Sequence, residues 1–489
     1  MKEKDATRQL EHSPYLWLFI GCALCIFSNG IFKIIPIATW LAPVFLIRFL
    51  RTQSKRKGLL LLVPVYCIAW LIMVYDLYSA MPAWVSIVSG LVYGIVFFLP
   101  YLADRLISPK IHGFLSTLVF PFAVVTIEFV MSVPPANSWF SLAYTQYGNL
   151  PFMQLVSITG IWGISFLIAW FASIVNWAWE QKFSLQKITK GSLLYVGIFI
   201  VILLFGGAYL TFFPADSDTV RVAAITRSFD MDVEAEKCKG DVPCLQKLFK
   251  RSLDEFLQDS KKAASVGAEI IMWQENGLAA YHYDEDEYVA KGSEFAIQEE
   301  VYVLMGMYML SEDRTVDENK AFLITPSGKV SEYLKNYVTP GDHHIVGDGK
   351  VLIQDSEYGK LATIICQDTH IIPFVRQAGK AHVDIMLIPN HNWESITPYV
   401  ARMPIFKAIE NGFSMVRADY HGLSSAVDYH GNVLAHMNDF TTEERIMIAD
   451  IPQKGVKTVY SQIGDVFAWL CVLGFLMMIG LSFSKVKQK

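Results

Sequence analysis

The chain has 489 residues, of which 53% are apolar and only 18% are charged, compared with about a quarter charged in an ordinary soluble protein. This composition excludes a disordered chain, which would be poor in apolar residues. The 46 acidic and 41 basic side chains give a net charge of −5, which excludes the strongly basic surface of a nucleic-acid-binding protein. The length allows roughly three domains.

The apolar residues are concentrated in two zones that flank a stretch with the composition of a soluble protein. A bilayer core about 30 Å thick needs roughly 20 apolar residues in a helix, and only helices satisfy all their backbone polar groups within lipid. We therefore predict a membrane bundle of about eight transmembrane helices, over residues 14–32, 34–50, 58–76, 83–102, 115–133, 161–179, 192–213 and 466–483.

The basic residues predict how these helices are oriented. With the N-terminus inside, the inside connectors carry sixteen lysines and arginines, whereas the short outside connectors carry only Lys33. This asymmetry agrees with the positive-inside rule. It predicts a membrane domain over residues 1–213, an extracytoplasmic domain over 214–460, and a last transmembrane helix with a basic tail over 461–489.

The cysteines and histidines do not predict a metal site. Cys238 and Cys244 lie in the polar segment KCKGDVPC on the predicted outer face. The two residues either form a disulfide there or remain as free thiols. The other cysteines except Cys366 lie in apolar helices, where we interpret them as packing residues. Five histidines match no metal-ligand spacing and are interpreted as pocket or surface residues: His343, His344, His370, His391 and His421.

The outer segment alternates strand-like and helical patterns, which is typical of a layered α/β domain. Three polar, reactive residues follow strand-like runs: Glu275 after IIMWQ, Lys335 in SEYLKNYVTP, and Cys366 after LATII. Active residues are commonly found where strands end. Taken singly, each of the three is more often a solvated or packing residue, so their order and spacing carry the argument.

The motifs in this segment resemble those of a known superfamily. WQEN is followed by KNYVTPG, ICQD, PNHNW and a helix with the sequence RMPIFKAIENG. This series is similar to the nitrilase superfamily with its Glu-Lys-Cys triad. Within that superfamily, seven helices, a nitrilase-like domain and a final helix resemble the apolipoprotein N-acyltransferases, which implies an αββα sandwich and a bacterial cell (inner) membrane location.

The resemblance implies that Glu275 is the general base, Lys335 the oxyanion stabiliser and Cys366 the nucleophile. The chemistry agrees with these roles, because a thiol with a pKa near 8.5 is mostly protonated at neutral pH and needs a base. The negative oxygen that forms during attack on a carbonyl is stabilised by an ammonium group and a backbone N–H. Lys335 and the N–H of Gln367 are the candidates for these donors.

The sequence departs from the acyltransferase pattern around the triad. The usual K-x-x-L-V-P-F-G-E reads KNYVTPGDH, so the auxiliary glutamate is missing and Asp342 is expected to replace it or to be an ordinary turn residue. The usual C-Y-E reads Cys366-Gln367-Asp368, which keeps an acid but loses the aromatic side chain. Trp273 and Trp393, from the WQEN and PNHNW motifs, are expected to line the pocket.

The preferred hypothesis is a membrane acyltransferase that works through a thioester. Cys366 would accept an acyl chain from a phospholipid, and the N-terminal amine of a lipoprotein would then take it. No nucleotide or metal motif is present, and this chemistry needs no cofactor. Two alternatives are a membrane-anchored nitrilase-like amidase that releases the acyl group to water, and a degenerate, non-enzymatic member that acts as a membrane scaffold.

Overall fold

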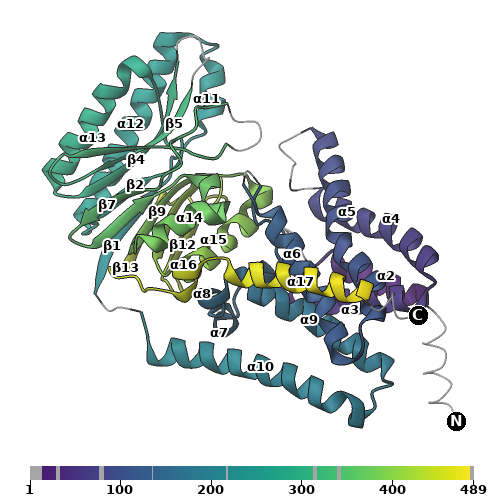
Figure 1. Cartoon of the computed structure of the whole chain (residues 1–489). Coiled ribbons are helices and arrows are strands. Elements are labelled where there is room, and N and C mark those ends of the chain that lie inside the picture. The colour runs from purple at the N-terminus through teal and green to yellow at the C-terminus, as the bar shows by residue number, and fades with distance from the viewer. Residues whose placement is uncertain are drawn as a thin grey trace. The chain divides into compact units, whose positions relative to one another are not determined.

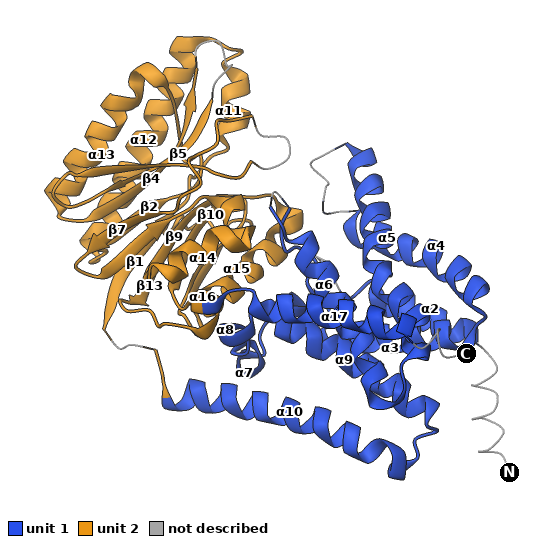
Figure 2. Cartoon of the chain, viewed as in Figure 1, with its two compact units in different colours: residues 1–212, 463–489 blue, residues 213–462 orange. Residues whose placement is uncertain are grey.

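A computed structural model describes residues 14–28, 34–75, 77, 82–134, 136–215, 218–311, 317–338 and 343–484. The chain divides into two compact units, residues 1–212 with 463–489 and residues 213–462 (Figure 2). Figure 1 labels their helices and strands. The predicted pairing of an α-helical membrane bundle with an α/β sandwich domain is confirmed.

The first unit consists of helices. Six helical segments in the described residues are long and apolar enough to cross a membrane: Lys55–Val74, Ala83–Lys110, Gly113–Met131, Ile161–Glu180, Leu185–Phe212 and Val466–Ser484. They contain α4 (Lys55–Val74), α5 (Ala83–Ile107), α6 (Val119–Met131), α9 (Ile161–Glu180), α10 (Leu185–Phe212) and α17 (Val466–Ser484). The first two predicted segments are also helical, but α2 (Pro14–Cys25) and α3 (Pro36–Thr52) have only 12 and 17 residues.

Polar contacts hold this unit together at a few buried points. Glu128 of α6 accepts hydrogen bonds from the hydroxyls of Ser141 and Ser165 and from the backbone N–H of Leu142. Trp162 of α9 donates to Asp465, directly before α17, at 2.9 Å. Ionisable groups within a bundle need such partners because lipid offers none.

The second unit contains two β-sheets. The first has the order β13-β1-β2-β4-β5-β6, with β3 also paired to β4, and the second has the order β12-β11-β10-β9-β8-β7. The first sheet contains β1 (Thr219–Ile225), β2 (Ile270–Trp273), β3 (Leu278–Tyr281), β4 (Tyr302–Leu310), β5 (Glu318–Ile324), β6 (Val330–Leu334) and β13 (Ile446–Pro452). The second contains β7 (Leu352–Ser356), β8 (Gly359–Thr363), β9 (Ile385–His391), β10 (Ser414–Tyr420), β11 (Leu423–Val427) and β12 (Val433–Asn438).

Helices cover the outer faces of both sheets, which gives the αββα layering seen in Figure 1. The first sheet carries α12 (Val242–Ser265) and α13 (Glu285–Glu299), and the second carries α14 (Ile372–Lys380) and α15 (Thr397–Asn411). The remaining helices are α11 (Met231–Lys237) and α16 (Val459–Ile463), together with α7 (Leu150–Met153) and α8 (Val156–Thr159) in the first unit.

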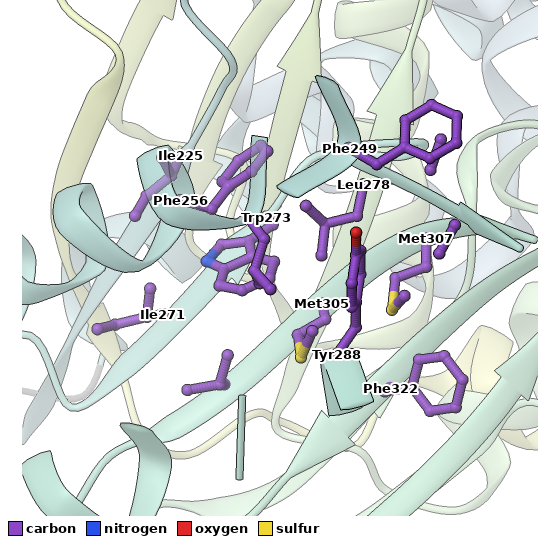
Figure 3. Packing of buried hydrophobic residues seen from close by; sticks show 14 of the residues in the cluster. Ile225, Phe249, Phe256, Ile271, Trp273, Leu278, Tyr288, Met305, Met307 and Phe322 are labelled. Atoms are coloured by element: carbon purple, nitrogen blue, oxygen red, sulfur yellow. The ribbon is translucent and has the colours of Figure 1, made fainter. Parts of the chain in front are cut away.

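Local sequence explains how α12 begins and which face it buries. The Asp241 side chain accepts a hydrogen bond from the backbone N–H of Cys244, which caps the helix, and Pro243 occupies the first turn. One face of the helix packs on the first sheet through Leu245, Phe249, Leu253 and Phe256. Figure 3 shows this core, in which Phe256 stacks on Trp273 of β2.

A disulfide joins Cys238 to Cys244. It links the residue after α11 to the first turn of α12. Of the two possibilities that the sequence left open, the structure therefore contains the disulfide. The remaining cysteines, Cys366 included, are free.

Candidate active site

Three strand ends of the second unit bring Glu275, Lys335 and Cys366 into one buried site. Glu275 follows β2 by two residues, Lys335 directly follows β6, and Cys366 follows β8 by three residues. Glu275 and Lys335 keep only 3% and 1% of their surface exposed, whereas Cys366 is half-buried. The two charged groups are thus withdrawn from water.

Glu275 is held by three donors. The Lys335 ammonium group and the Asn319 amide donate to its Oε1, both at 2.8 Å, and the backbone N–H of His391 donates to its Oε2 at 2.9 Å. Burial alone would raise the pKa of Glu275. The charge and hydrogen bond of Lys335 and the bond from Asn319 outweigh burial and hold that pKa below its usual value. The carboxylate is therefore ionised at neutral pH.

A glycine allows the backbone at Glu275 to lie against β4. A Cβ atom at Gly306 would collide with the carbonyl oxygen of Gln274 and would meet the Cα of Glu275 at 3.2 Å. The close approach of two backbones therefore requires glycine at this position.

Cys366 occupies a strained backbone position at the start of a 3₁₀ turn, Cys366–His370. Its φ angle is +43°, in the left-handed region that non-glycine residues rarely adopt, and such strain is concentrated at functional positions. Its Sγ lies 3.8 Å from the carbonyl oxygen of His391. Burial raises the pKa of the thiol well above its usual range, and the nearby Glu275 carboxylate raises it further. At neutral pH the resting group is therefore a thiol, which needs a base before it can attack.

Asp368 holds the segments on both sides of the site. It is completely buried and accepts hydrogen bonds from the Tyr333 hydroxyl at 2.5 Å and from the backbone N–H groups of Asn336, Tyr337 and Ile365. Burial raises its pKa to about 6, although these hydrogen bonds oppose the shift. Asp368 therefore ties the Lys335 segment to the Cys366 turn. Gln367, between Cys366 and Asp368, is half-buried.

Of the other residues predicted to line the pocket, Trp273 lies in the hydrophobic core instead. Trp273 is completely buried in the hydrophobic core beside α12, where its indole N–H donates to Ser260 at 2.9 Å (Figure 3). Its side chain therefore belongs to the helix-covered face of the first sheet. Trp393 is half-buried and follows β9 by two residues. Asp342 lies outside the described residues.

Asn319 was not predicted as a site residue, and His391 was interpreted only as one of five pocket or surface histidines. Asn319 lies in the interior of β5, and nothing in its local sequence distinguishes it from an ordinary strand residue. His391 stands in the PNHNW motif, and its backbone is bonded to both Glu275 and Cys366. The motif was the available signal for His391.

One group of metal-capable side chains lies close together within the described part of the chain: His282, Glu285 and Glu318. Both carboxylates already pair with Lys320, whose Nζ atom lies 2.8 Å from Glu318 and 3.2 Å from Glu285. The carboxylates are therefore engaged by an ammonium group of the chain itself.

Comparisons with known proteins agree with the two-unit organisation. Residues 245–460 match the carbon-nitrogen hydrolase family, and residues 14–174 match the apolipoprotein N-acyltransferase N-terminal domain. An apolipoprotein N-acyltransferase of Geobacter metallireducens is 25% identical over 453 residues, covering 85% of this chain and 84% of the relative. Apolipoprotein N-acyltransferase 1 of Treponema denticola is 24% identical over 396 residues, covering 68% of this chain and 70% of the relative.

Among solved structures, an amidase from Nesterenkonia sp. aligns with a TM-score of 0.39 and 17% identity, over 53% of this chain and 98% of the amidase.

Proposed function

Because the chain belongs to the apolipoprotein N-acyltransferase family of the carbon-nitrogen hydrolase superfamily, we propose that it moves an acyl chain from a phospholipid to the N-terminal amine of a lipoprotein. The reaction proceeds through a thioester on Cys366. The observation that carries this assignment of residues is the meeting of a buried carboxylate, an ammonium group and a free thiol at three strand ends.

In the first half-reaction, Glu275 takes the proton of the Cys366 thiol as sulfur attacks the ester carbonyl of the phospholipid. Lys335 and the backbone N–H of Gln367 stabilise the negative oxygen of the tetrahedral intermediate. The carbon–oxygen bond of the ester then breaks, and Glu275 returns the proton to the departing alcohol of the lysophospholipid. The acyl chain remains on sulfur as a thioester.

In the second half-reaction, a neutral amine attacks the thioester carbonyl and forms a carbon–nitrogen bond. Glu275 removes a proton from the attacking nitrogen and delivers it to the Cys366 sulfur as the carbon–sulfur bond breaks. An amide and a free thiol result, so the protein is ready for another cycle. A water molecule attacking in place of the amine would give the hydrolase reaction.

Membrane attachment supports a lipid substrate. The second unit continues at both ends into apolar helices, α10 and α17, and a tethered enzyme meets membrane lipids at a high effective concentration. The excess of basic residues in the predicted inside connectors supports an extracytoplasmic position for residues 213–462. In intact cells, a membrane-impermeant maleimide should label Lys329→Cys but should not label Lys55→Cys. Both positions are exposed, and labelling of the unsubstituted chain gives the background.

The proposed activity is tested by incubating the purified protein with a phospholipid that carries a tagged acyl chain. Mass spectrometry should find a hydroxylamine-sensitive acyl group on Cys366, and a lipopeptide with a free N-terminal amine should remove it as an amide. Cys366→Ala is the control and should acquire no label. If free fatty acid is released at a rate that the lipopeptide does not change, the protein is a hydrolase and the transferase proposal is contradicted.

A further inference from the structure

His391 lies between the proposed base and the proposed nucleophile. Its backbone N–H donates to Glu275 Oε2 at 2.9 Å, and its carbonyl oxygen lies 3.8 Å from Cys366 Sγ. It is the last residue of β9 and pairs in register with Tyr420, the last residue of β10. The imidazole is therefore carried by the backbone segment that contacts both reacting groups, and it is half-buried there.

A row of side chains leads from His391 to the surface of the second unit. The His391 ring lies edge-on to the ring of His421 at a centroid distance of 5.7 Å. Nε2 of His421 lies 3.9 Å from Oδ2 of Asp230, and both of these side chains are more than a third exposed. Tyr420 packs against both imidazoles, with ring centroids 5.2 Å from His391 and 4.0 Å from His421.

Burial favours the neutral form of the His391 ring. Burial lowers its pKa, and the positive charge of Arg227 and the neighbouring His421 lower it further, against the opposite influence of Glu275 and Asp232. A neutral imidazole at pH 7 has a free nitrogen lone pair and can accept a proton. Besides these groups, the titratable side chains nearby are Tyr420, whose ring packs on the imidazole, and Cys366, which contacts the His391 carbonyl.

The second half-reaction produces one proton that the triad does not consume. An α-amino group has a pKa of about 7.7–8.0, so at pH 7 roughly nine in ten acceptor amines arrive as ammonium ions. An ammonium ion has no lone pair and must lose a proton before it attacks the thioester. Glu275 transfers one proton from the attacking nitrogen to sulfur. The proton that the ammonium ion loses before the attack needs another acceptor that can release it to water.

We infer that His391 is this acceptor, and that His421 and Asp230 pass the proton on to solvent. This inference rests on the proposed acyl transfer to an amine. One proton leaves the ammonium nitrogen for an imidazole nitrogen of His391, moves to His421 directly or through one water molecule, and is released beside Asp230. No bond to carbon changes in this step. The neutral amine that remains is the nucleophile of the second half-reaction.

His391→Gln tests this inference, because glutamine keeps the backbone contacts with Glu275 and Cys366 and removes the proton-accepting imidazole. The rate of thioester formation from tagged phospholipid is measured in parallel, and the rate of discharge is expressed relative to it. Discharge onto the lipopeptide amine at pH 7 should fall about tenfold, since only the neutral fraction of the amine can then react. At pH 9, where nearly all the amine is neutral, the difference should vanish.

A second acceptor and a matched control complete the experiment. Hydroxylamine is already neutral at pH 7, so it should discharge the wild-type and His391→Gln thioesters at equal rates. His436→Gln removes an exposed histidine on β12 and should behave as the wild type with both acceptors. His421→Gln should show a smaller defect of the same pH dependence.

Two results would overturn the inference: discharge onto the lipopeptide at pH 7 that is unchanged in His391→Gln, or a defect of equal size at pH 7 and pH 9. The second of these would indicate a purely structural role. Failure of the proposed function is recognised separately, because the wild type itself would then form no thioester with phospholipid.

Discussion

The Nζ atom of Lys335 lies 2.8 Å from Oε1 of Glu275, and both side chains are almost completely buried. A second buried ion pair, Lys407 with Glu410 on α15, has nearly the same N–O distance, 2.9 Å, and the same degree of burial. Asn319 and the backbone N–H of His391 also bind Glu275. Because the two pairs are alike in distance and burial, a variant of the second pair serves as a control. It separates the chemical role of the first pair from the contribution of that pair to stability.

Glu275→Gln should change the reactivity of Cys366 in two opposite directions. Enzymatic acylation by phospholipid should fall by at least about 100-fold, because the general base is lost. Alkylation by iodoacetamide at pH 8 should become faster, because the carboxylate that raises the thiol pKa is gone and the thiolate fraction increases. Both rates are measured by mass spectrometry of the Cys366 peptide.

Glu410→Gln is the control for this variant. It removes one charge from the other buried pair and should lower stability to a similar extent, but it should leave the alkylation rate of Cys366 unchanged. Slower alkylation in Glu275→Gln than in the wild type would show that Glu275 does not raise the thiol pKa.

Asn319→Ala should weaken catalysis without removing a charged group. The variant loses the amide that donates to Glu275 Oε1 at 2.8 Å, so the carboxylate is less firmly oriented and its pKa rises. We expect thioester formation to slow by about tenfold, which corresponds to the roughly 1.5 kcal/mol typical of a hydrogen bond to a charged group. The measurement is the initial rate of acylation of Cys366 by tagged phospholipid.

Asn432→Ala provides the comparison for Asn319→Ala, because Asn432 makes the same type of amide–carboxylate bond, to Asp428 at 2.8 Å, in a turn between β11 and β12. Its acylation rate should match that of the wild type. Equal slowing in both variants would mean that the effect of Asn319→Ala reflects general loss of stability.

Asp368→Asn should make the free energy of unfolding less dependent on pH. The carboxyl has a pKa of about 6 in the folded chain against an ordinary value of 3.8, so the folded state binds the proton more tightly. Its contribution to stability is therefore present below about pH 4 and is lost as the pH rises through about 6. Between pH 5 and pH 8 the free energy of unfolding of the wild type should fall by about 1 kcal/mol, whereas that of the variant should not show this decrease.

Thermal unfolding in detergent at pH 5 and pH 8 measures this difference for Asp368. The deficit in Tm of Asp368→Asn relative to the wild type should be larger at pH 5 than at pH 8. Asp355→Asn, at an exposed position of β7, should show the same small difference at both pH values. A deficit for Asp368→Asn that grows toward pH 8 would contradict the raised pKa.

The double variant Cys238→Ser/Cys244→Ser should be less stable than the wild type by about 2 kcal/mol. The disulfide closes a short loop between α11 and α12, and loss of that constraint increases the entropy of the unfolded chain. The Tm should fall in the double variant, and a reducing agent should lower the Tm of the wild type by the same amount. Thioester formation on Cys366 should persist, because the disulfide belongs to a different segment.

The sequence by itself determined the classes of structure and led to a prediction of the reacting residues. Runs of about twenty apolar residues require helices in a membrane, and the alternation of strands and helices between residues 214 and 460 requires a layered domain. The apolar runs and the alternating patterns are local, so neighbouring residues are sufficient to reveal them. Glu275, Lys335 and Cys366 were predicted from the order and spacing of their motifs, which resemble those of the nitrilase superfamily.

Only the tertiary structure decided which side chains surround those three residues. Asn319 lies inside β5 and looks like any strand residue until the folded sheet brings its amide within hydrogen-bond distance of Glu275. Trp273 stands two residues before Glu275, a spacing that would place both side chains on the same face of a continuous strand. Trp273 nevertheless lies in the core (Figure 3), because β2 ends at Trp273 and Glu275 lies beyond it. The row from His391 to His421 and Asp230 joins three separate segments. Their proximity depends on strand order and register, which long-range pairing fixes and no local pattern contains.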